Sequence, residues 1–234
     1  MATRTASKPY AKKTKAELEE LARERDIDGR SQMTKDELVT ALERDDTGPD
    51  ALELLVDQHD RIKELFESLS SRATRPSKAK LDDVRELVST LVKHAEIEEL
   101  VFYPAVREAL SDDDLVDEGL EEHHAAELLM WELERLPADA PRYDAKVTVL
   151  KENVLHHIEE EETELFPKVE KTIGEDRRRE LGAAMVRAWD IAPSRPHPLS
   201  PDTPPGNWLA GIPAAGLDVV VGAFKSVKRV VFRR

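Results

Sequence analysis

The sequence predicts an all-α protein whose largest part is an up-down-up-down four-helix bundle. Charged residues make up 36% of the chain and aromatic residues only 5%, a composition more typical of solvated helices than of a sheet-rich domain. Between residues 50 and 190, apolar residues recur at helical spacing over long segments. The breaks between these segments are short, and short connections between long helices predict antiparallel neighbours.

The bundle is expected to span residues 50–190. Breaks at Arg72–Ser77, Ser111–Asp114 and Leu136–Arg142 divide it into helices near 50–71, 78–109, 113–135 and 143–171, and a fifth helical pattern spans 175–190. Pro104 and Pro167 are expected to kink or end the second and fourth helices, because proline removes a backbone donor.

A smaller helical module is expected at residues 1–46, with helical patterns at Lys15–Arg25 and Thr34–Arg44. Thr14 and Thr34 are each followed three residues later by a glutamate, which is the signature of a capping box. Asp45–Pro49 has the composition of a linker.

The C-terminal segment, residues 191–234, begins as a Pro-rich tether that contains His197. Leu217–Phe232 then has the pattern of an amphipathic helix with a basic end. This tail is expected to dock on the acidic bundle, with a partner protein or an anionic membrane surface as alternatives.

The charge and the cysteine count exclude several classes. Residues 47–190 carry 36 acidic and 19 basic side chains, which argues against nucleic-acid binding by the bundle. The absence of cysteine excludes disulfides, iron–sulfur clusters and thiolate zinc sites, and it fits a reducing cytoplasm, the expected location. We find no pattern of a secretory signal or of a transmembrane helix.

Each bundle helix places at least one polar, metal-ligating residue type where the apolar stripe predicts an inward position. The set is His59 on the first helix, His94 and Glu98 on the second, His123 and Glu127 on the third, and His157 and Glu161 on the fourth. Burying such groups without partners costs several kcal/mol. They could neutralise one another in a network, but a metal ion is the preferred explanation because it satisfies imidazoles and carboxylates together.

The two halves of the bundle repeat this pattern. His59 precedes His94 by 35 residues, and His123 precedes His157 by 34. The second histidine of each half is followed by a glutamate four residues later, which puts both on one helical face. Two such units facing across a bundle provide two metal positions and two carboxylates that can bridge them.

The side chains beside these positions receive simpler interpretations. His124 and His156 are expected to point outward, and the aromatic residues Phe102, Tyr103 and Phe166 are expected in the core. A solvated acidic face is expected from Glu96, Glu99, Glu159, Glu160 and Glu162, with one or two of them supporting the ligands.

With this doubled motif, residues 50–172 resemble the hemerythrin-like (HHE cation-binding) family. The resemblance implies that His59, His94, His123 and His157 are terminal ligands and that Glu98 and Glu161 bridge two non-haem irons. The oxygen-carrying hemerythrins have a further histidine at the position of Glu127. The more oxygen-rich donor set here argues against simple reversible oxygen carriage and leaves manganese plausible beside iron.

These expectations define a non-haem, di-iron protein that binds or responds to oxygen, peroxide or nitric oxide, or that handles iron. One alternative is a catalase-like or ferroxidase-like enzyme, in which Glu127 relays protons. Another is an adaptor for nucleic acid or membrane that carries a structural metal.

Residues 10–43 resemble the helix–loop–helix module found at the N-terminus of the transcription terminator Rho and in SAP-type DNA-binding proteins. This resemblance implies weak nucleic-acid binding, with phosphate contacts from Lys12, Lys13, Lys15, Arg30 and Lys35. A role in docking another protein is an equal alternative.

Overall fold

The computed structural model describes residue 10 and residues 12–24, 27, 29–72, 77–110 and 114–198, and within these ranges every regular element is helical. The chain divides into two compact units, Met1–Pro49 and Asp50–Arg234. The amphipathic helix that the sequence predicts at Leu217–Phe232 lies outside the described residues.

The N-terminal unit contains α1 (Lys15–Glu24), a short 3₁₀ turn (Arg30–Gln32) and α2 (Lys35–Thr47). Both capping boxes form, because the backbone N–H groups of Thr14 and Thr34 donate to Glu17 and Glu37 at 2.7 and 2.6 Å. A small core holds the unit together and consists of Tyr10, Leu18, Ala22, Leu38 and Leu42.

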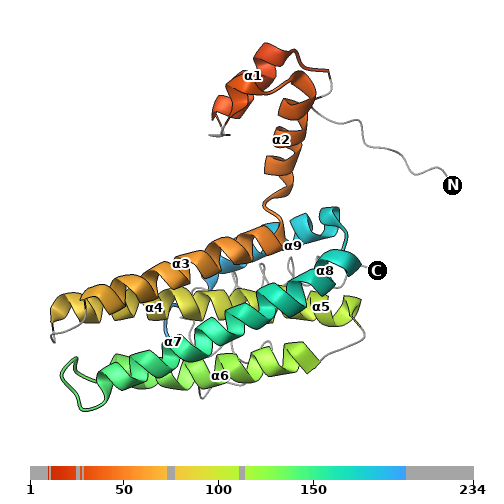
Figure 1. The fold of residues 1–234 in the computed structure, drawn as a ribbon. Helices are drawn as coiled ribbons and strands as arrows, with labels where there is room; N and C mark the ends of the chain where they lie inside the picture. Colours follow the sequence, from red (N-terminus) through yellow and green to blue (C-terminus); the bar gives the residue numbers. More distant parts are fainter. Residues whose placement is uncertain are drawn as a thin grey trace, which may run out of the picture. The chain divides into compact units, whose positions relative to one another are not determined.

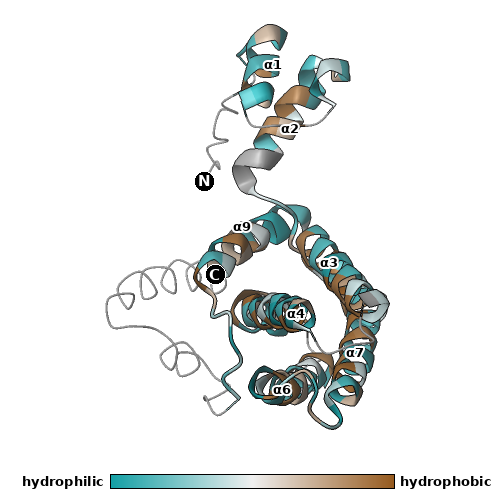
Figure 2. Cartoon of the chain, turned by 90° about the vertical axis from the view of Figure 1, so that its left-hand side faces the viewer, coloured by the Kyte–Doolittle hydropathy of each residue, from teal (hydrophilic) through white to brown (hydrophobic). Residues whose placement is uncertain are grey.

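Four long helical rods lie side by side in the second unit (Figure 1). They are α3 (Ala51–Arg72); α4 (Lys78–Ile97) continuing into α5 (Tyr103–Ala109); α6 (Asp114–Arg135); and α7 (Tyr143–Glu160) continuing into α8 (Phe166–Thr172). Helix α3 packs on α4, and α6 packs on α7. Brown, apolar faces of α3, α4, α6 and α7 turn toward the interior in the end-on view of Figure 2. The predicted all-α bundle is confirmed.

Two apolar clusters fill the bundle, one on each side of a polar layer. Leu55 and Phe102 belong to the first cluster, and Ile62 and Leu91 belong to the second. His59 lies on α3 between Leu55 and Ile62 and is fully buried. The metal-ligating residue types therefore occupy a layer between two apolar clusters.

Pro104 and Pro167 do not end the second and fourth rods, because each rod continues past its proline after a π-helical turn. Segment η2 (Glu98–Phe102) joins α4 to α5, and η3 (Glu161–Leu165) joins α7 to α8. At the end of each turn, Tyr103 and Phe166 donate their N–H groups to the carbonyls of Glu98 and Glu161. The wider turn accommodates the following proline, which has no N–H and would clash with a carbonyl in a regular α-helix. Each π turn begins at one of the predicted bridging glutamates.

A fifth helix, α9 (Glu175–Ile191), packs on α3 and α4. The Arg178 guanidinium binds Asp50 at the start of α3, with Nε 2.8 Å from Oδ2. On the other flank, the Lys93 ammonium of α4 donates to the carbonyl of Trp189 at 3.1 Å. Helix α9 therefore covers the α3–α4 side of the bundle. None of the described helices is long and apolar enough to cross a membrane.

Candidate metal centre

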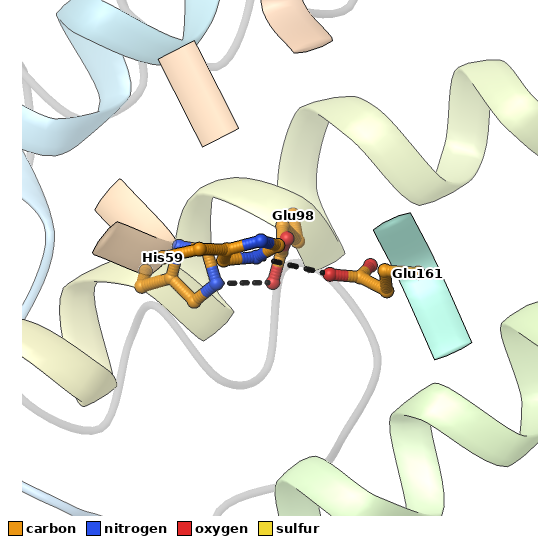
Figure 3. A group of neighbouring side chains, drawn as sticks. His59, Glu98 and Glu161 are labelled. Atoms are coloured by element: carbon orange, nitrogen blue, oxygen red, sulfur yellow. Dashed lines mark ion pairs between the residues drawn. The ribbon is translucent and has the colours of Figure 1, made fainter. Parts of the chain in front are cut away.

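Six of the seven predicted ligands meet in the polar layer. His59, His94, Glu98 and Glu161 form one group, and Glu98, His123 and His157 form a second. Within each group the candidate ligand atoms all lie within 4.8 Å of one another, and Glu98 belongs to both. Figure 3 shows the side chains of His59, Glu98 and Glu161 pointing toward a common centre.

Each glutamate faces two imidazoles from different helices. Glu98 Oε2 lies 3.4 Å from Nε2 of His94 on α4 and 3.4 Å from Nε2 of His123 on α6. Glu161 Oε2 lies 3.2 Å from Nε2 of His59 on α3 and 3.6 Å from Nε2 of His157 on α7. Both carboxylates therefore lie between the two histidine pairs, where a bridging ligand would stand.

The donor atoms fit a metal because several have no other partner. His59 Nε2, His94 Nε2, both oxygens of Glu98 and Glu161 Oε2 are buried without a hydrogen-bond partner. Such atoms are rare in folded proteins because each one loses its hydration without compensation. Imidazole nitrogens and carboxylate oxygens together suit first-row transition ions. Coordination to such ions would satisfy all of these atoms at once.

Residues 50–169 match the model of the hemerythrin HHE cation-binding domain, which is about half of the chain. The chain belongs to this family. A hemerythrin-like protein of Schizosaccharomyces pombe is 26% identical over 135 residues, covering 57% of this chain and 66% of that protein. A DNA nickase of Nostoc sp. is 26% identical over 119 residues, covering 51% of this chain and 33% of that protein.

The chain therefore spans less than two thirds of the length of either relative. No solved structure matches it.

Every histidine of the hemerythrin-like centre is held by a partner on its other ring nitrogen. The Nδ1 atoms pair with Glu162 for His59 (2.9 Å), Gln58 for His94 (2.8 Å), Glu99 for His123 (3.1 Å) and Glu122 for His157 (2.8 Å). Such partners fix the ring orientation and the tautomer, leaving Nε2 for a metal.

Two of these partners, Glu99 and Glu162, come from the acidic face that the sequence predicted to contribute one or two supporting residues. Gln58 and Glu122 were missed by sequence reasoning. Their positions could have indicated them, because Gln58 and Glu122 immediately precede His59 and His123, the first histidine of each half.

Without a metal, the titratable groups of the centre have pKa values shifted in different directions. Burial and repulsion from Glu161 raise the pKa of Glu98 to about 7. Burial alone would also raise the pKa of Glu161, but the positive charges of His157 and His59 hold it well below its usual value. Burial opposes the charging of His123, yet Glu98 and Glu99 outweigh it and raise its pKa to about 10. Protons therefore occupy part of the site when no metal is bound.

Glu127 does not join either ligand group. It lies one turn beyond His123 on α6, is partly buried, and accepts a hydrogen bond from the backbone N–H of His197. Burial raises its pKa. The carboxylate of the second group is that of Glu98 in η2, so the geometry gives no support to Glu127 as a ligand or proton relay.

The side chain of His156 is 63% exposed, whereas His157 is buried.

Tyr103, which the sequence placed in the core, also contacts the centre. Its hydroxyl donates to Glu161 Oε1 at 3.0 Å, and its ring stacks on His123 with centroids 5.6 Å apart. In the other half, Phe166 stacks on His59 in the same way, at 5.7 Å. Both halves of the bundle therefore stack an aromatic ring on a histidine of the centre, but only Tyr103 of these two rings carries a hydroxyl.

Gly119 on α6 makes room for this hydroxyl. A Cβ at Gly119 would lie 2.8 Å from the Tyr103 hydroxyl oxygen, which is closer than real contacts allow. We expect Gly119→Ala to displace Tyr103 and to lower the free energy of unfolding by about 1–3 kcal/mol, as overpacking does. Denaturant unfolding of the metal-free protein measures this.

The matched background for this change is Tyr103→Phe, which removes the clashing oxygen. In that background Gly119→Ala should cost distinctly less, so the double-mutant cycle should show coupling. Equal costs in the two backgrounds would mean that Gly119 is not there to accommodate Tyr103.

The five predicted phosphate-contacting residues all lie in the N-terminal unit, and Lys12, Lys15 and Lys35 are exposed. Lys15 pairs with Glu19 at 3.3 Å, and Arg30 donates to the carbonyl of Ile27 at 3.0 Å. These contacts neither require nor exclude a nucleic-acid ligand. Lys13 is half-buried, and binding through this unit stays a prediction.

Proposed function

We propose that the bundle is a non-haem di-iron protein that binds oxygen, peroxide or nitric oxide at its centre. The observation that carries this proposal is the pair of ligand groups sharing Glu98, with Glu161 facing a histidine of each group. With both glutamates bridging, each ion would receive two imidazoles and two carboxylate oxygens. A structural site normally saturates its metal with protein ligands, whereas a reactive site leaves positions open.

Four protein donors per ion would leave positions open to a further ligand. The residues that would hold the ions lie in a layer between two apolar clusters. Bound iron would supply the redox chemistry. The contribution of the chain would be to orient the four imidazoles, keep bulk water out, and place the Tyr103 hydroxyl as a donor beside Glu161.

The family membership supports metal binding, and the donor set supports iron or manganese over a hard ion such as magnesium, which prefers oxygen ligands alone. A catalase-like or ferroxidase-like activity would use the same open positions. Sensing and turnover therefore differ in the fate of the ligand rather than in the architecture of the site.

The test begins with metal-free protein reconstituted with ferrous iron under anaerobic conditions. Elemental analysis should give about two irons per chain, and oxidation should produce near-ultraviolet absorption that a zinc-loaded sample lacks. Trace iron only after reconstitution would contradict the proposal.

Addition of peroxide to the loaded protein then separates the two versions. Loss of many peroxide molecules per centre indicates an enzyme, whereas a stoichiometric spectral change indicates a binding or sensing role. A His59→Ala/His157→Ala variant, which removes one imidazole from each group, is the matched control and should show neither change.

A further inference from the structure

A narrow pocket opens beside the centre on the α6–α7 side of the bundle. Its walls come from α6, the end of α7 and η3, and they include Gly119, Glu122, His157, Glu160 and Glu161. Glu161, which is 3% exposed, belongs both to this lining and to the candidate metal centre, where its Oε2 has no hydrogen-bond partner. The pocket therefore lies directly beside a candidate ligand of the centre.

A third group of metal-ligating side chains is associated with this pocket. Glu122, His156 and Glu160 each offer one ligand atom, and these atoms lie within 4.8 Å of one another. His156 Nε2 lies 3.5 Å from Glu160 Oε1, and the His156 side chain is largely exposed. We call these three residues the outer triad.

Glu122 joins the outer triad to the centre. Its carboxylate belongs to the triad and also bonds Nδ1 of His157 at 2.8 Å, and Nε2 of the same imidazole faces the inner ligands. An ion held by the outer triad is therefore one residue away from a ligand of the centre.

The repeat shows that the opposite side of the bundle has no equivalent of the triad. Residues of α6 correspond to those of α3 with an offset of 64, and residues of α7 correspond to those of α4 with an offset of 63. At the counterparts of Glu122, His156 and Glu160, the chain has Gln58, Lys93 and Ile97. The first half therefore replaces two carboxylates and an imidazole with an amide, an ammonium and an alkyl group.

On the α3–α4 side, apolar side chains occupy the positions that correspond to Gly119 and Glu160. The counterpart of Gly119 is Leu55, and both Leu55 and Ile97 are fully buried. They pack in one cluster with Leu181 and Met185 of α9, the helix that covers α3 and α4. Two ligand groups thus share one centre, and the polar pocket described above lies on its α6–α7 side.

We propose that the outer triad is a loading site, which captures a divalent transition-metal ion at the surface and passes it through the pocket to the centre. This inference rests on the proposed metal centre and adds a route and a direction to it. The two carboxylates raise the local concentration of cations, and the exposed imidazole selects transition ions over magnesium and calcium. The ion moves from Glu160 and His156 toward Glu122 and then to Glu161 and His157.

Uptake of ferrous iron by the full-length, metal-free protein tests this route. Anaerobic stopped-flow mixing, followed by a chromogenic ferrous chelator that reports unbound iron, gives the loading rate. We expect Glu160→Gln and His156→Ala each to slow loading about tenfold, the lower end of the range for electrostatic focusing. Both variants should still reach the wild-type final iron content, because neither residue belongs to the inner groups.

The control is Glu159→Gln, which removes the same charge from an exposed neighbour on α7 that does not line the pocket. It should load at the wild-type rate. Wild-type rates in both triad variants, an equal slowing by Glu159→Gln, or a lower final iron content in the triad variants would each overturn the loading site. Failure of the wild-type protein to bind iron at all would instead overturn the proposed centre.

Discussion

Replacing Glu98 with glutamine is expected to reduce metal binding from about two ions per chain to at most one. Glu98 belongs to both ligand groups, and both of its oxygens are buried without a hydrogen-bond partner. An amide has no charge and is a poorer ligand for iron than a carboxylate, so both metal positions lose a donor together. Elemental analysis after ferrous reconstitution measures the change, and circular dichroism confirms that the variant remains helical.

The matched change is Glu127→Gln, on the third helix of the bundle. Sequence spacing predicted Glu127 as a ligand, whereas the structure places its carboxylate against the backbone N–H of His197. We therefore expect this variant to keep about two ions. Two ions in the Glu98 variant, or loss of metal only in the Glu127 variant, would show that the ligand groups are wrongly assigned.

A second large effect is expected from pH, because protons compete with metal for the same atoms. In the metal-free protein the pKa of Glu98 is raised from 4.5 to about 7, and that of His123 from 6.5 to about 10. Both groups therefore bind protons more tightly in the folded than in the unfolded chain. Their contribution to the free energy of unfolding is fully present below the pKa values of the unfolded chain. It is lost as pH rises through the pKa values of the folded chain.

Glu161 acts in the opposite sense, because its pKa lies below the usual 4.5. Its contribution is present above pH 4.5 and falls as the solution becomes more acidic than that. Between pH 5.5 and 8, Glu98 and His123 should make the metal-free protein less stable as pH rises. His94 opposes them up to about pH 6.5, because burial holds its pKa well below that usual value.

The metal-loaded protein should behave differently over the same range. Each proton that must leave before an ion binds changes the apparent affinity about tenfold per pH unit. The difference in melting temperature between loaded and metal-free protein should therefore widen steadily from pH 5.5 to 8 at fixed free metal. A constant difference would mean that no ligand proton is released on binding.

The sequence by itself determined the helices and most of the candidate ligands. Apolar periodicity and short breaks fixed the four rods, because a helix that buries one face must repeat every 3.6 residues. The doubled unit of His59 with His94 and Glu98, and of His123 with His157 and Glu161, predicted six candidate ligands, and the structure brings these six side chains together in two groups. The capping boxes at Thr14 and Thr34 were equally local, and both form.

Only the tertiary structure decided how the candidate ligands combine and where a pocket forms beside the centre. Glu127 satisfies the same spacing rule as Glu98, but spacing gives a helical face and not a depth. The structure places Glu98 and Glu161 in the ligand groups and Glu127 against the backbone N–H of His197. Each histidine has its Nδ1 partner on a different helical segment from its own, so no local sequence pattern could pair the two. The two halves share the ligand spacing, yet α9 packs with Leu55 and Ile97 in one cluster, whereas Gly119 and Glu160 line a pocket. Packing between distant segments removes a symmetry that spacing along the chain suggests.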